Sequence, residues 1–316
     1  MLTDEKSAAE LAALALGTLS TELAQYQQEP QQMASAAVGK SGYLRLRFTK
    51  KGNRSVLHEM ERKVPLLVQK ALYWDEEMPF LPCVPIISTS GCILQGDRLS
   101  SVIEVAEGAS AHVTTQSATK IHSMDSNYAA QTQFIHVDEG AYLEFMPDPI
   151  IPHRNSRFIN ETIIECAHNA TVIYSEILMS GRKYHHHDER FGFDVYSSRM
   201  TVKNLQGETL FTEKLVLEPK EHPLDVVGVM GAFDTYGNVI VITEKAFQDE
   251  ILEQSPSCYS QEFCHGVSRL PNDCGLIFKA LSCDSAKVKQ CIREFWHIVR
   301  KVTTGYSLPA PFLWKV

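Results

Sequence analysis

The sequence lacks the features that mark several large classes of protein. No apolar run approaches the ~20 residues that a membrane-spanning helix requires. The net charge is −8, whereas a protein that binds nucleic acid needs a basic face to neutralise phosphates. The eight cysteines include no Cys-x-x-Cys pair, and the spacing from Cys258 to Cys291 fits no familiar zinc pattern. We therefore expect a cytoplasmic protein with reduced cysteines that binds neither a membrane nor nucleic acid.

Signatures of common enzymes are also missing. The chain contains no His-Glu-x-x-His, no Gly-x-Ser-x-Gly and no glycine-rich dinucleotide fingerprint. Residues 91–97 resemble a phosphate-binding loop, but Asp97 stands where the lysine that pairs with phosphate should be. A carboxylate there would repel phosphate, so nucleotide binding is not expected. With 316 residues, 44% hydrophobic and 22% charged, the composition is that of an ordinary globular protein.

The first forty residues differ from the rest of the chain. The apolar run of residues 11–16 follows Asp4 and Glu5 and lies beside Glu10, which argues against a signal peptide. We interpret it as a short amphipathic helix, joined by a linker over residues 27–40 that is rich in Gln, Ala and Ser. The sequence therefore predicts an N-terminal extension over residues 1–40 and a β-rich domain over residues 41–316.

The middle of the chain contains one pattern three times. An alternating apolar run, a tight turn, an alanine and a second alternating run recur at a period of about thirty residues. The copies cover residues 103–115, 135–145 and 164–174, with turns at Gly108, Gly140 and Asn169, which lie 32 and 29 residues apart. Gly and Asn adopt positive φ most readily. The period predicts a mainly β, solenoid-like stack of short strands with a few helices, and the alternative is a coincidence of hairpins.

Other segments predict individual elements. Leu44, Leu46 and Phe48 alternate with polar residues, which indicates a half-exposed strand. We expect a strand over residues 58–72 despite Pro65, a hairpin at residues 205–210, and a turn at residues 234–238 ahead of an apolar strand.

The C-terminal region changes to a helical period. Apolar residues from Val288 to Val302 fall at helical spacing on one face. They predict an amphipathic helix that begins after Asp284 and Ser285. The apolar tail of residues 308–314 would have to be covered by another surface.

Two sets of side chains are candidates for metal binding. On a strand, His185, His186 and His187 would point to alternating faces, but on a turn two of them could chelate nickel or zinc together with Asp188. A solvated loop is the simpler interpretation. Acidic residues near apolar strands could form a buried carboxylate set or lie on the surface: Glu77, Asp97, Glu176 and Glu213.

Several segments occur in an order that resembles the UreD/UreH family of urease accessory proteins. They are Gly96–Ser100, Thr114–Ile121, Leu143–Ile150, Ser175–Arg182 and the ending Phe295–Trp314. The resemblance covers residues 43–316. Where the family often has a Gly-Gly pair before the aspartate, this chain has Gln95-Gly96. The first forty residues and the three histidines have no counterpart in the family pattern.

The resemblance implies a β-solenoid fold and a non-enzymatic function. Such a protein would be a urease maturation chaperone that docks on apo-urease with UreF and the GTPase UreG. Nickel would reach the buried urease site through that complex. The complex could also form a dimer of heterocomplexes. No tightly bound cofactor is implied, only transient Ni²⁺.

The resemblance also suggests where nickel would pass. Asp97 falls on the family's Gly-Asp motif and Glu176 on its acidic position before Leu-x-x-Gly-Arg, with Glu77 and Glu213 as further acidic positions. Carboxylates hold nickel loosely enough for transfer. The alternative is a β-solenoid enzyme that acts on a carbohydrate or ester with paired carboxylates as acid and base.

Overall fold

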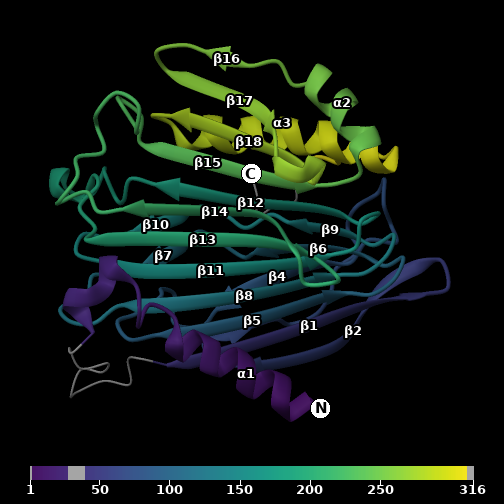
Figure 1. Cartoon of the computed structure of the whole chain (residues 1–316), viewed down its shortest axis with the longest axis horizontal. Coiled ribbons are helices and arrows are strands. Elements are labelled where there is room, and N and C mark those ends of the chain that lie inside the picture. Colours follow the sequence, from purple (N-terminus) through teal and green to yellow (C-terminus); the bar gives the residue numbers. More distant parts are fainter. Residues whose placement is uncertain (1, 28–39, 312–316) are drawn as a thin grey trace.

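The computed structural model describes residues 2–27 and 40–311. Most of the predicted linker and the end of the apolar tail (Phe312, Leu313 and Trp314) therefore lie outside the described residues. Two large sheets stacked face to face form the body of the described chain (Figure 1).

The first sheet has seven strands in the order β14-β13-β11-β8-β5-β1-β2. Their bounds are β1 Ser41–Lys51, β2 Arg54–Lys63, β5 Arg98–Val105, β8 Ala129–Val137, β11 Arg157–Cys166, β13 Val195–Asn204 and β14 Thr209–Leu217. The turn between β13 and β14 is the hairpin predicted at residues 205–210.

The second sheet has eleven strands. Nine follow the order β16-β17-β18-β15-β12-β9-β6-β4-β3, with β7 and β10 beside this path. Their bounds are β3 Leu66–Leu67, β4 Cys83–Ser88, β6 Ser110–Thr115, β7 Thr119–Ile121, β9 Tyr142–Phe145, β10 Ile150–Pro152, β12 Thr171–Met179, β15 Thr235–Ile242, β16 Cys258–Tyr259, β17 Phe263–Arg269 and β18 Gly275–Ser282.

Helices are few in the described chain, and the predicted mainly β class is confirmed. The α-helices are α1 Leu2–Ala15, α2 Lys245–Glu253 and α3 Ser285–Thr304, and short 3₁₀ turns are η1 Thr21–Tyr26, η2 His187–Glu189 and η3 Pro271–Asp273.

Each of the three similar units gives one strand to each sheet. β5, β8 and β11 are parallel neighbours in the first sheet, and β6, β9 and β12 are parallel neighbours in the second. The two strands of a unit do not pair with each other, so the units are not hairpins. Gly108 and Gly140 have φ of +60° as expected. Asn169 does not have positive φ; instead its side-chain oxygen accepts a hydrogen bond from the Gly140 backbone N–H at 3.0 Å.

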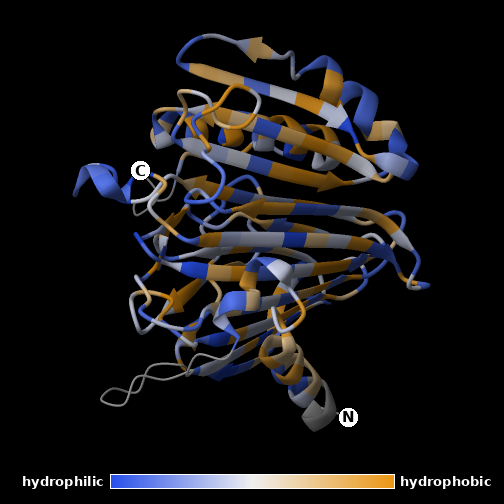
Figure 2. Cartoon of the chain, turned by 60° about the vertical axis from the view of Figure 1, so that its left-hand side comes forward, coloured by the Kyte–Doolittle hydropathy of each residue, from blue (hydrophilic) through white to orange (hydrophobic). Residues whose placement is uncertain are grey.

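Apolar side chains fill the space between the sheets, and both outer faces are covered in part. Figure 2 shows the alternation of apolar and polar residues along the strands that produces these faces. On the first sheet, α1 contacts β1, β5 and β8, and Leu23 of η1 is fully buried. Glu22 beside it accepts a hydrogen bond from Ser197 at 2.7 Å and lies 3.0 Å from the Lys214 ammonium. The described part of the predicted extension thus packs on the first sheet.

Helix α3 covers the second sheet. Asp284 caps its first turn by accepting a hydrogen bond from the Ala286 N–H at 2.9 Å, and Gly305 ends it in a left-handed conformation. Its buried residues include most of the predicted apolar face, among them Val288, Ile292 and Phe295, whereas Val302 at the end of that face is partly exposed.

The predicted turn at residues 234–238 is wrong, because β15 begins at Thr235. A Cβ atom at Gly237 would lie 2.7 Å from Val288 and 2.8 Å from Ile292. The glycine therefore does not mark a turn here; it allows α3 to lie close against the sheet.

Two further expectations need correction. The strand predicted over residues 58–72 ends at Lys63, and β3 begins after Pro65, which has no N–H for a sheet ladder. The first strand is not half exposed, because Tyr43 and Arg45 on its polar side are also buried. Arg45 is paired with Glu59 and Glu104.

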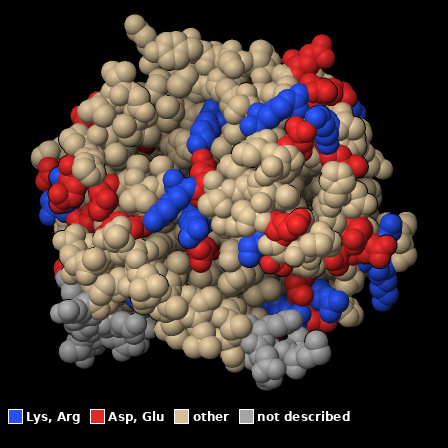
Figure 3. All heavy atoms as spheres, viewed as in Figure 1, with Lys and Arg blue, Asp and Glu red and all other residues tan. Residues whose placement is uncertain are grey.

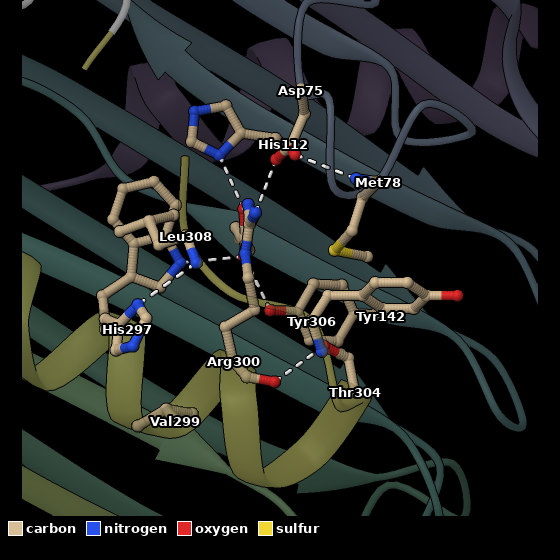
Figure 4. Close-up of polar contacts among 12 residues, drawn as sticks. Asp75, Met78, His112, Tyr142, His297, Val299, Arg300, Thr304, Tyr306 and Leu308 are labelled. Atoms are coloured by element: carbon tan, nitrogen blue, oxygen red, sulfur yellow. Dashed lines mark hydrogen bonds and ion pairs between the residues drawn. The ribbon is translucent and has the colours of Figure 1, made fainter. Parts of the chain in front are cut away.

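A buried ionic network joins α3 to the middle of the second sheet (Figure 4). Arg300 is 1% exposed, and its guanidinium contacts both carboxylate oxygens of Glu144 at 2.7 Å and one oxygen of Asp75 at 2.5 Å. Tyr142, Trp296 and His112 also bond to Glu144, at 2.6, 2.8 and 2.9 Å. The other oxygen of Asp75 accepts the backbone N–H groups of Glu77 and Met78.

The charges in this network support one another. Burial alone would raise the pKa of Glu144, but Arg300 and His112 bring it below its usual range. Burial alone would lower the pKa of His112, but Cys83 and Glu144 raise it to about 9. Since the carboxylates are satisfied by donors from α3, β6, β9 and a loop, the network fixes these four segments relative to one another.

The network predicts that Arg300→Met destabilises the protein strongly. Breaking a buried ion pair from one side leaves uncompensated charge and costs about 3–5 kcal/mol. The matched control is Lys301→Met on the exposed face of α3, which should change the free energy of unfolding by less than about 0.5 kcal/mol. Denaturant unfolding of both variants measures the difference, and equal effects would contradict the assigned role.

Candidate functional site

A cavity with a mixed apolar and polar lining lies between the two sheets. Its volume is about 140 Å³, and it lies toward the end of the stack where β5, β8 and β11 begin and β12 ends. Its polar lining from the first sheet is Ser100, Ser101, Gln131, Gln133 and Asn160, and from β12 it is Tyr174, Ser175 and Glu176. Since sheet-on-sheet interiors are normally apolar, this polar lining marks the cavity as a candidate site.

Hydrogen bonds order much of this lining. The side-chain oxygen of Gln133 accepts from the hydroxyls of Thr162 and Tyr174, at 2.9 and 3.0 Å. The Tyr174 ring stacks on Phe145 with centroids 5.1 Å apart. A buried polar cluster of this kind is stable only when its members are satisfied, and here it connects the two sheets across the interior.

Glu176 is the buried carboxylate of this cavity. It projects from β12 toward the first sheet, where the hydroxyls of Tyr196 and Ser198 on β13 donate to its two oxygens at 2.9 and 3.0 Å. Burial raises the pKa of Glu176, and these two hydrogen bonds offset the rise only in part. The carboxylate has no cationic partner among the contacts of the described residues, which is unusual for a buried charge.

Glu213 lies close to Glu176, as a carboxylate set requires. Its negative charge contributes to the raised pKa of Glu176. Glu213 projects from β14 and accepts a hydrogen bond from Asn238 at 2.8 Å, and Asn238 is the register partner of Glu176. Lys279 pairs with its other oxygen. The structure therefore brings two of the four predicted carboxylates together.

Asp97 is placed elsewhere and has local partners. Its two oxygens accept the backbone N–H groups of Lys40 and Leu94, at 2.9 and 2.8 Å. Burial raises its pKa above the usual value. It follows Gly96, which has φ of +74°, so Asp97 fixes the turn into β5. Gln95, where the family often has glycine, caps the next loop by accepting the N–H groups of Asp125 and Ser126.

Glu77 is exposed on the loop before β4. The buried acid of that loop is Asp75, which pairs with Arg300. Sequence reasoning missed Asp75, Glu144 and Arg300, because a buried ion pair between positions 156 or more residues apart leaves no local pattern. The one available signal was Arg300 at a helix position beside the apolar face.

The three histidines lie on the loop between β12 and β13. His186, His187 and Asp188 come together there, with ligand atoms within 4.8 Å of one another. His185 is exposed and does not belong to this group. The group is separate from the contacts of Glu176.

The surface has no single charge character on the face drawn in Figure 3, where Lys and Arg are interspersed with Asp and Glu. All eight cysteines are free thiols. No helix among the described residues is long and apolar enough to cross a membrane.

Comparison with known proteins gives a consistent result. The model of the family described as UreD urease accessory protein matches residues 40–315. A urease accessory protein UreD of Yersinia pseudotuberculosis serotype O:1b is 63% identical over 305 residues, which cover 96% of this chain and 95% of that protein. Proteins with the same name from Yersinia enterocolitica serotype O:8 and Photorhabdus laumondii are 61% and 58% identical, each over at least 94% of both chains.

The family model begins at residue 40, in agreement with the expectation that the first forty residues lie outside the family pattern. Individual relatives match further: an alignment over 96% of 316 residues leaves about 13 uncovered, so it includes much of the first forty residues. The relatives are named as accessory proteins, in agreement with the prediction that the chain is not an enzyme. The chain belongs to the UreD family of urease accessory proteins.

Proposed function

We propose that this protein is a urease maturation chaperone that conducts nickel toward the urease active site. It would act in the cytoplasm, docked on apo-urease together with UreF and the GTPase UreG. The observation that carries the proposal is the cavity between the sheets with the carboxylate of Glu176, whose contacts among the described residues are two hydroxyl donors and no cation. Ni²⁺ is the cargo of this passage and not a resident cofactor.

The chemistry of the cavity suits transfer of a divalent cation. Hydroxyl, amide and carboxylate oxygens bind Ni²⁺ more weakly than imidazole or thiolate, so an ion can be attracted and then released. Glu176 supplies a negative charge inside the protein, where the low dielectric strengthens its field. Glu213 on β14 adds negative charge near Glu176, although Lys279 pairs with it. Membership of Asp97 and Glu77 in the path stays a prediction.

The architecture supports a scaffold. The three stacked units, each with one strand in each sheet, are the basis for proposing a short β-solenoid. The loop of residues 224–231 exposes valines, with Val227 fully exposed. It borders a surface groove of about 660 Å³ that Tyr259 also lines. Such apolar surface is typical of protein contacts.

The raised pKa of Glu176 predicts how its removal affects stability. A carboxyl group whose pKa is higher in the folded state stabilises the fold below its unfolded pKa and loses that contribution as pH rises through the folded pKa. Glu176→Gln, which cannot ionise, should therefore gain stability relative to the parent as pH rises from 4 to 8. Thermal unfolding across this range measures the trend, and a variant much less stable than the parent at pH 8 would indicate a structural role.

The proposed path predicts a separation between assembly and nickel delivery. Glu176→Ala and Glu176→Gln should retain the complex with UreF and apo-urease but lower the nickel content of urease, since the charge inside the cavity is lost. Glu165→Gln, on the outside of β11, is the matched control and should deliver nickel normally. The measurement is nickel per urease active site beside a pull-down.

The same measurement tests Asp97. Because its oxygens hold two backbone N–H groups, Asp97→Ala should reduce folding and assembly along with nickel content. Reduced nickel with assembly intact would instead place Asp97 on the path. Full nickel occupancy in both Glu176 variants would refute the path through the cavity.

A further inference from the structure

The loop between β12 and β13 turns sharply at its histidines. His186 is extended, with φ −156° and ψ 151°, and the 3₁₀ turn η2 begins at the next residue. On a strand, successive side chains would point to opposite faces; the change of conformation instead brings those of His186, His187 and Asp188 to the same side. The rings of His186 and His187 lie 4.1 Å apart between centroids.

The spacing of the polar atoms is close to that of ligands around one ion. Nε2 of His187 lies 2.7 Å from one oxygen of Asp188, and Nδ1 of His186 lies 3.5 Å from the other. Two ligand atoms on a zinc-sized ion, with bonds of about 2.1 Å, can be no more than about 4.2 Å apart. The three ligand atoms lie within 4.8 Å, so small side-chain rotations would bring all three into range.

The backbone that carries the cluster is anchored on both sides. Glu189, which follows it, is buried, pairs with Arg182 at 2.5 Å and accepts the Arg154 N–H. A Cβ at Gly181 would lie 2.2 Å from the Glu189 carbonyl oxygen, and one at Gly192 would lie 2.1 Å from that of Asp188. Two glycines thus let the turn pack tightly. Its backbone is therefore already ordered before a metal ion binds.

We infer that His186, His187 and Asp188 form a surface site for a divalent transition-metal ion of the nickel and zinc class. Two imidazoles and one carboxylate suit these ions, and water would complete the coordination. The His187 side chain is 83% exposed, so ions exchange readily with solvent. Arg154 lies 3.2 Å from Asp188 and offsets part of its charge, which keeps the affinity moderate.

The location of the site suggests a role in nickel delivery. This role rests on the function proposed above. The loop leaves β12 at Met179, three residues after Glu176, and therefore lies at the same end of the stack as the polar cavity. A solvent-exposed imidazole site at this end would collect Ni²⁺ before it passes to the weaker oxygen ligands inside. Collection by imidazole and onward passage by carboxylate are distinct steps with distinct residues.

The test is metal binding by the full chain without a histidine tag, measured by equilibrium dialysis with Ni²⁺ alone and with Zn²⁺ alone. The double variant His186→Ala with His187→Ala should bind one equivalent less than the parent. Asp188→Asn should weaken that equivalent about tenfold or more. His185→Ala is the matched control, since it removes a neighbouring exposed imidazole outside the cluster, and it should bind as the parent does.

Two results would overturn the inference. One is a double variant that binds as many ions as the parent with the same affinity. The other is a loss in His185→Ala equal to that in the double variant, because an unstructured histidine tract would bind in that way. Glu176→Gln should still bind the metal ion that the double histidine variant loses. Failure of the internal path and failure of the surface site are therefore distinguishable. Circular dichroism of each variant confirms that the fold is retained.

Discussion

The buried pair between Arg300 and Glu144 is the interaction on which the arrangement of the second sheet depends. A helix can cover a sheet through apolar contacts alone, but such contacts tolerate sliding. The guanidinium reaches both oxygens of Glu144 and one of Asp75, and this bidentate geometry admits one position of α3. Because burying these charges is costly unless all are paired, the network also ties the loop before β4 to the same point. The helix, the sheet and that loop therefore form one unit.

The interior between the sheets has a polar layer between two apolar ones. On one side of it lie apolar residues such as Ile103, Ile135 and Ile164, which align on neighbouring strands by register. The same strands next present Ser, Gln and Asn to the cavity, and nearer their starts they are apolar again, at Leu99, Ala129 and Phe158. The two apolar layers supply the stability that lets the polar layer persist. A carboxylate retained there against its own desolvation, as at Glu176, is the kind of group that function explains better than stability does.

The sequence predicted what depends on local pattern and missed what depends on distant pairing. The three units, α3 and the hairpin after β13 each have a short-range signature, and each is found in the structure. The turn predicted at residues 234–238 failed because Gly237 is needed for contact with α3, about fifty residues further along the chain, which no local rule can register. Glu176 and Glu213 were chosen as acidic positions by resemblance, and folding placed them together. Asp97 was chosen on the same basis, yet its partners are the backbone N–H groups of a turn.

The histidine loop illustrates how a correct rule can give an incomplete answer. Adjacent side chains do diverge on a strand, so by that rule consecutive histidines can form a site only on a turn. The outcome changes because the chain leaves the strand conformation between His186 and His187, at a point fixed by the buried Glu189 and by two glycines. Those constraints come from the packing of the loop against Pro152 and Arg154, not from the histidines themselves. The arrangement of His186, His187 and Asp188 thus follows from the packing of this loop, which leaves β12 at the same end of the fold as the cavity.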